Sequence, residues 1–235
     1  MSMHEQQSEA AEREDWDEDD WEAFLRQADA RTARYQELFE TLIDHPSRDA
    51  IIAHEMGWDS FFSECRSKVE NCDECPDRFE CEAYEMLRLM EGPDNIDDDP
   101  EAKELLACFE EVKDIEAYRL AYDFAARLEK KFREALADDT DDEAVHTALL
   151  SATMAPAQIA GGHGIGYDRP SLCGNIANCK RALKNVKTCE RCLNELEKNG
   201  ALPSETAAAL RQENATVARS LERWIENLRS RVCWR

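Results

Sequence analysis

The sequence predicts an all-α protein: an irregular helical bundle of seven or eight helices with two cysteine-ligated metal sites. Three observations lead to this prediction. Apolar residues recur every three or four positions along most of the chain, and no stretch alternates apolar and polar residues long enough to form a strand. Eight of the ten cysteines fall into two groups of four. With 235 residues, 43% of them hydrophobic, the chain can bury one sizeable core.

An acidic lead and a long helix are expected at the N-terminus. Residues 1–17 are expected to be disordered, because the first 20 residues hold nine acids against one Arg and few apolar positions. From about residue 18 the apolar period becomes helical and predicts an amphipathic helix that ends before Pro46. Ser47 can then cap a short helix that runs through Met56.

Two further helices complete a first helical region, which we place at residues 18–92. One begins at Asp59 and carries Cys65. The other spans about 76–91, because a proline stands in its first turn and Gly92 follows its last.

The rest of the chain, residues 100–235, is expected to form a helical bundle, and the two regions together one compact unit. Residues 100–137 predict one long helix or two in series, because the apolar phase slips near 115–120. Another helix, from about residue 143, should kink or end at Pro156.

The last two helices should pair as an antiparallel hairpin. They are expected at about 175–199 and 204–232, and both have heptad-like apolar spacing. The segment Gly200–Pro203 joins them.

The first cysteine group is the more specific metal motif, and it comprises Cys65, Cys72, Cys75 and Cys81. A Cys-x-x-Cys turn presents two sulfurs, a proline starts a helix directly after it, and a third sulfur lies in that helix. The positive end of a helix lowers the pKa of nearby thiolates and offsets the negative charge of a cluster. Cys65 is the nearest candidate for the fourth ligand.

Residues 72–84 resemble the iron–sulfur motif of the WhiB-like family of actinobacterial regulators, in which Cys-x-x-Cys-Pro-x-Arg-x-x-Cys and a following aromatic residue hold a [4Fe–4S] cluster. The matching residues are Cys72, Cys75, Pro76, Arg78, Cys81 and Tyr84. The resemblance implies cluster chemistry in a helical protein. It is confined to this motif, since the family's Gly-Trp-Gly-Gly turn and basic DNA-contacting tail are missing.

The second cysteine group follows a glycine-rich stretch, residues 161–167, and comprises Cys173, Cys179, Cys189 and Cys192. The glycine-rich stretch is expected to be a loop whose amide N–H groups can donate to cluster sulfides or a phosphate. We therefore mark Gly162, His163 and Gly164 as candidate cofactor-binding residues. If the loop is only a flexible connection, His163 is a solvated residue.

Two [4Fe–4S] clusters, one for each cysteine group, are the leading functional expectation. Four cysteine ligands leave no open iron position, which favours electron transfer or redox and oxygen sensing through a protein partner. The alternatives are a zinc-stabilised helical interaction protein and an iron–sulfur enzyme with a site at Gly161–Tyr167. No catalytic residue is assigned.

Other metal arrangements stay open. Cys72 and Cys75 could share one site with Cys189 and Cys192. Glu143-Ala-Val-His146 has the Glu-x-x-His spacing of di-iron bundles, although those need two such pairs. Copper storage along helix faces is disfavoured, because the cysteines form no regular stripe.

The charge distribution separates the end of the chain from the rest. A net charge of −23 argues against a general nucleic-acid binder. Residues 175–235, however, carry 12 Lys and Arg against 7 Asp and Glu. We expect this basic arm to pack on the acidic part of its own chain or to dock an acidic protein partner. No signal peptide or membrane-spanning stretch is recognised, which predicts a cytoplasmic protein.

Overall fold

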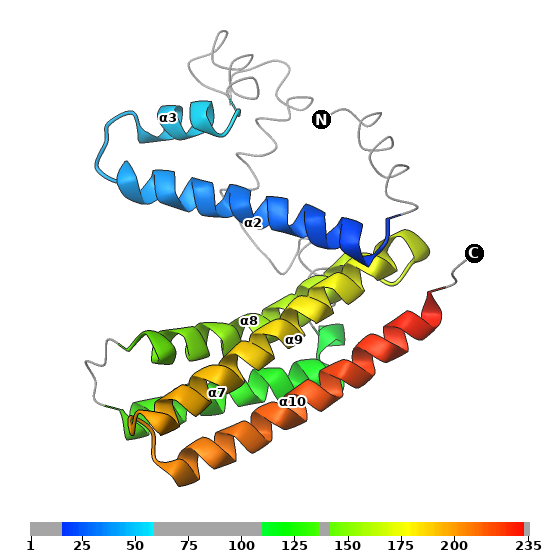
Figure 1. Ribbon diagram of the computed structural model, residues 1–235. Helices are drawn as coiled ribbons and strands as arrows, with labels where there is room; N and C mark the ends of the chain where they lie inside the picture. The colour runs from blue at the N-terminus through cyan, green and yellow to red at the C-terminus, as the bar shows by residue number, and fades with distance from the viewer. Residues whose placement is uncertain (1–15, 59–109, 137–141, 233–235) are drawn as a thin grey trace. The chain divides into compact units, whose positions relative to one another are not determined.

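The computed structural model describes residues 16–58, 110–136 and 142–232, in which every regular element is a helix (Figure 1). The predicted all-α class is therefore confirmed for these residues. The first cysteine group, the motif at 72–84 and the helices expected around them lie outside the described residues. The chain forms two compact units, one of residues 1–23 with 106–235 and one of residues 24–105.

Four helices of the first unit pack as a bundle: α7 (Glu116–Ala135), α8 (Glu143–Ile165), α9 (Arg169–Lys198) and α10 (Ser204–Arg231). Each helix packs against the next, and α10 closes the ring on α7 (Figure 1). Their apolar sides meet in a single core. The largest fully buried side chains in it include Phe124, Leu128, Ile159, Ile176, Leu193, Leu210, Leu221 and Leu228.

The predicted hairpin of the last two helices is confirmed by α9 and α10. Gly200, with a φ of 73°, lies in the connection, in a left-handed conformation that glycine adopts readily. Between the helices, the buried amide of Asn214 donates a hydrogen bond of 2.9 Å to the Val186 carbonyl. This bond fixes the register of the hairpin at a buried position, where an unpaired donor would be costly.

The glycine-rich stretch is helical, contrary to the expected loop. Helix α8 continues through Pro156 and ends only at Ile165, and Gly166 follows with a φ of 117°. The glycines serve close packing instead. A Cβ atom on Gly162 would lie 2.8 Å from Asn175 Oδ1 and 3.0 Å from the Asn175 carbonyl oxygen, so only glycine lets α8 and α9 approach this closely here.

The start of α7 settles an alternative that the sequence left open. A helical turn ends at Val112, residues 113–115 form a break, and α7 begins at Glu116. The slip in apolar phase therefore marks a real interruption between two helical segments. Val112, the last residue before the break, and Ile115, the last residue within it, are both buried.

Helices α2 (Glu18–Thr41) and α3 (Arg48–Glu55) confirm the predicted helix ends around Pro46. The second unit contains α3 and most of α2, and there Arg34 pairs with Glu55 at 3.1 Å while the Tyr35 and Trp58 rings lie 5.8 Å apart. Ser47 stands at the N-cap of α3 as predicted, but its side chain makes no capping hydrogen bond.

Candidate functional site

All four cysteines of the second group lie on one helix, α9, and the structure does not bring them together. Cys173 and Cys192 are separated by about 28 Å along the helix axis, whereas sulfurs that share one zinc ion lie within about 4 Å of each other. Cys189 and Cys192 do share a face, as predicted, and that face is buried in the core. Among the described residues no group of three or more His, Cys, Asp or Glu could hold a metal ion.

The chemistry of these thiols also fits core residues better than metal ligands. Burial raises the pKa of Cys179 and of Cys189 to about 12, so both are neutral thiols near pH 7. Because its four sulfurs are spread along one helix, the second group, as it stands in this fold, does not fit a four-cysteine cluster.

The candidate cofactor-binding residues Gly162, His163 and Gly164 lie on helix α8 and not in the expected loop. Gly162 is buried against Asn175 and has no room for a ligand, while Gly164 is exposed with nothing near its Cβ position. His163 is not solvated: its side chain is 10% exposed, and its Nδ1 lies 2.7 Å from the Tyr167 hydroxyl. His163 and Tyr167 thus form a hydrogen-bonded pair at the end of α8.

The Glu-x-x-His pair does not point into the bundle. Glu143 and His146 are both exposed on α8. The interior of the four helices is filled by apolar side chains. A di-iron centre in the core would need both residues to project inward.

The basic arm, residues 175–235, forms ion pairs with acidic residues of its own chain. This is the first of the two alternatives that the charge distribution predicts. The contact is made by residues 16–23, here called the N-terminal segment, which lies in the same compact unit as α9 and α10. Trp21 anchors the segment and is 6% exposed. Its indole packs so closely on Gly174 of α9 that a Cβ there would lie 2.7 Å from the ring. The sequence contained no sign of this tryptophan–glycine contact.

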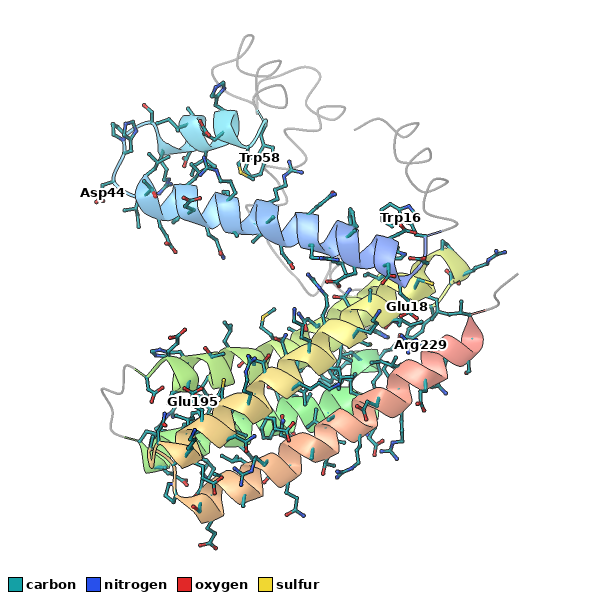
Figure 2. The ribbon with its side chains drawn as sticks, viewed as in Figure 1. Trp16, Glu18, Asp44, Trp58, Glu195 and Arg229 are labelled. Atoms are coloured by element: carbon teal, nitrogen blue, oxygen red, sulfur yellow. The ribbon has the colours of Figure 1, made fainter. Side chains whose placement is uncertain are left out.

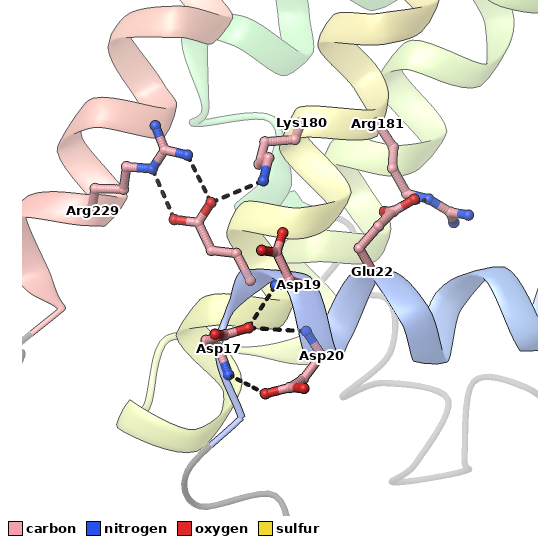
Figure 3. A network of polar contacts seen from close by, with 8 residues as sticks. Asp17, Asp19, Asp20, Glu22, Lys180, Arg181 and Arg229 are labelled. Atoms are coloured by element: carbon pink, nitrogen blue, oxygen red, sulfur yellow. Dashed lines mark hydrogen bonds and ion pairs between the residues drawn. The ribbon is translucent and has the colours of Figure 1, made fainter.

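Glu18 is the centre of the ion-pair network at this contact (Figures 2 and 3). Arg229 donates two hydrogen bonds to its carboxylate, Nε to Oε1 at 2.8 Å and Nη2 to Oε2 at 2.7 Å. Lys180 Nζ lies 3.2 Å from Oε2. These cations, Arg229 most of all, hold the pKa of Glu18 below its ordinary value of 4.5. Beside them, Arg181 pairs with Glu22 at 3.1 Å.

A reciprocal cap starts α2 and orients Glu18. Asp17 Oδ1 accepts hydrogen bonds from the backbone N–H groups of Asp19 at 2.8 Å and Asp20 at 3.0 Å (Figure 3). Asp20 Oδ2 accepts in return from the Asp17 N–H at 3.1 Å. Those backbone hydrogen bonds lower the pKa of Asp17. The spacing of two acids three residues apart before an apolar position could have revealed this cap in the sequence.

Further along α9, a group of cations has no acidic partner in the described part of the chain. Lys180, Lys184, Lys187 and Arg191 recur at intervals of four, three and four, so they lie on one side of the helix, which we call the basic face. Together with Leu183 and Thr188 they line a hollow of about 500 Å³. Lys180 is paired with Glu18, but Lys184, Lys187 and Arg191 make no ion pair with any described residue.

The chain matches no protein-family model, no curated protein and no solved structure. Within the described ranges, none of the helices combines the length and the apolar character that crossing a membrane would require.

Proposed function

We propose that this protein is an interaction module that binds an acidic protein segment on the basic face of α9. The observation that carries the proposal is a row of three cations, Lys184, Lys187 and Arg191, that form no ion pair with any residue that the structure describes, in a chain with 52 acidic and 29 basic residues. Acids are abundant, so a basic residue placed without regard to function would easily find a partner. No acid in the described part of the chain pairs with this row.

The cost of the row supports the same conclusion. Like charges three or four residues apart on a helix destabilise it by a few tenths of a kcal/mol per pair. An acid from another helix, as Glu18 of α2 is for Lys180, would offset that repulsion. A ligand that supplies carboxylates would remove it on binding.

An acidic peptide fits this face better than a nucleic acid does. The basic face is only about 16 Å long, from Lys180 to Arg191. The protein as a whole carries a charge of −23, so acidic residues surround this short positive strip. A phosphate backbone extends well beyond such a strip and meets the surrounding acids. A short carboxylate-rich segment can stay within it, with Leu183 and Thr188 offering contacts between the charges.

The test is a titration of a fluorescently labelled oligoglutamate peptide of about ten residues, long enough in helical form to span the row, followed by anisotropy at low salt. Neutralising the row (K184Q, K187Q and R191Q together) should weaken binding at least about tenfold, since three partly exposed charge pairs contribute roughly 0.5–1 kcal/mol each.

The chain offers a matched control. Lys130, Lys131 and Arg133 on α7 have the same charges, and each lies near Glu134 or Glu129. Replacing these three by Gln should leave the affinity unchanged. Equal losses in the two triple variants would show that only the overall charge matters and would refute the site. A labelled single-stranded oligonucleotide that binds the row more tightly than the peptide would point to a nucleic-acid ligand instead.

A cluster at the first cysteine group is a separate proposal that rests on the motif alone. Iron and sulfide assayed after anaerobic purification should give about four iron atoms per chain if Cys65, Cys72, Cys75 and Cys81 hold one cluster, and about eight if both groups do. Zinc without iron or sulfide would support the alternative of a zinc-stabilised interaction protein.

A further inference from the structure

We infer that the chain carries its own competitor for the basic face, in residues 1–15, here called the lead. The inference that this contact regulates binding rests on the proposed function. The lead holds five acids, Glu5, Glu9, Glu12, Glu14 and Asp15, and one Arg.

The place where the lead joins the described structure favours this occupant. Residue 16 is followed within two positions by Glu18, which contacts Lys180, the first cation of the basic face. Trp21 and the Asp17 cap hold this junction in place. The point at which the lead is attached therefore lies close to Lys180, one helical turn from Lys184.

Length and spacing agree with an antiparallel alignment along α9. Lys180 and Arg191 are eleven positions apart in the sequence, and so are Glu5 and residue 16. The acids Glu5, Glu9 and Glu12 follow one another at intervals of four and three, and Arg191, Lys187 and Lys184 do the same in the opposite direction. Residues at these intervals lie on one side of a helix.

The alignment assigns each acid to one cation. Glu12 meets Lys184, Glu9 meets Lys187 and Glu5 meets Arg191. The observed partner of Lys180 is Glu18, which lies two residues beyond the end of this register. Glu14 and Asp15 fall outside this set. An external acidic segment must then displace the lead, whose attachment gives it an effective concentration in the millimolar range.

The first experiment compares the affinity of the oligoglutamate probe for four full-length forms, the wild type and three variants, and for a chain that lacks residues 1–15. E5Q/E9Q/E12Q and the shortened chain should both bind about three- to tenfold more tightly than the wild type, because the competitor is weakened or removed. As the control, E14Q/D15N should change the affinity much less than E9Q/E12Q, although both pairs remove two negative charges. Equal effects would mean general repulsion and overturn the inference.

The second experiment needs no probe. A carbodiimide joins carboxylates to amines that are in contact, and mass spectrometry of the dilute wild-type chain should find Glu12 linked to Lys184 and Glu9 linked to Lys187. If no such link forms and the shortened chain binds the probe as the wild type does, the inference fails and the proposed function stands. If the links form but no form of the chain binds the probe, the lead does occupy the face and the proposed function fails.

Discussion

The basic side of α9 has two parts with opposite surroundings. At Lys180 and Arg181 the cations meet Glu18 and Glu22 of the N-terminal segment, which Trp21 anchors on Gly174. From Lys184 to Arg191 the same helix presents cations without an acidic partner among the described residues. The difference shows that this chain can neutralise the charge of α9 with its own acids, and that the acids of residues 16–58, 110–136 and 142–232 do so over only part of the helix.

The paired part is a structural contact and the unpaired part is the candidate binding surface. The two parts should therefore respond differently to substitution. Changes in the paired part should lower the stability of the fold, and changes in the unpaired part should weaken binding without lowering stability.

The largest effect is expected from Trp21→Ala. The indole is almost fully buried against α9, and truncating a buried Trp costs about 3–5 kcal/mol when its site cannot collapse. Unfolding in urea should show a loss near the lower end of this range, because the residue lies at the edge of the bundle. A loss below about 1 kcal/mol would show that the N-terminal segment is not packed as described.

Gly174→Ala should have the next largest effect. The added Cβ would lie 2.7–2.9 Å from three atoms of the Trp21 ring, and overpacking of this kind costs about 1–3 kcal/mol. Gly164→Ala is the matched control, because Gly164 is helical and nothing lies within 4 Å of its Cβ position. That change should raise stability by up to about 1 kcal/mol. Similar urea midpoints for the two variants would contradict the close contact.

Glu18→Gln should lower stability and alter its pH dependence. Because Arg229 and Lys180 hold the pKa of Glu18 below 4.5 in the folded chain, its contribution is present above that value and is lost as the pH falls through the lower pKa of the folded state. The wild type should therefore exceed the variant in stability at pH 7, and the difference should shrink as the pH falls below about 4.5. Thermal melts across this range give the comparison. A difference that grows on acidification would refute it.

The smallest effect on stability is expected from Lys187→Gln. Removing one charge of the unpaired row relieves repulsion from Lys184 and Arg191, so stability should stay the same or rise by a few tenths of a kcal/mol. Arg229→Gln should instead destabilise, because it breaks the two hydrogen bonds to Glu18. If Lys187→Gln cost about 1 kcal/mol or more, the cation would have a structural partner and the row would not be free.

Much of the fold followed from periodicity and end signals. The end of α2 before Pro46, the start of α3 after Ser47 and the hairpin of α9 with α10 were predicted, because each depends on residues near one another in the chain. The glycine-rich stretch was misread as a loop. Its glycines are explained by Asn175, a residue on another helix, and local sequence does not contain that information.

The site was only partly predictable. Net charge indicated that the basic arm would meet acids, and the structure confirms this for Glu18 and Glu22. The periodicity of the basic face is visible in the sequence, but which of its cations are paired depends on where Trp21 places the N-terminal segment. Cysteine spacing suggested a shared metal for Cys173–Cys192, whereas an uninterrupted helix separates these sulfurs.

The central claim, that acidic segments bind the unpaired row, is tested most directly by observing individual lysines. Reductive methylation with ¹³C keeps the positive charge and gives each lysine its own NMR signal. When the chain that lacks residues 1–15 is titrated with oligoglutamate, the signals of Lys184 and Lys187 should shift together and saturate, while those of Lys130 and Lys131 stay in place. Shifts of equal size at all four lysines, or no shift at Lys184 and Lys187, would contradict the claim.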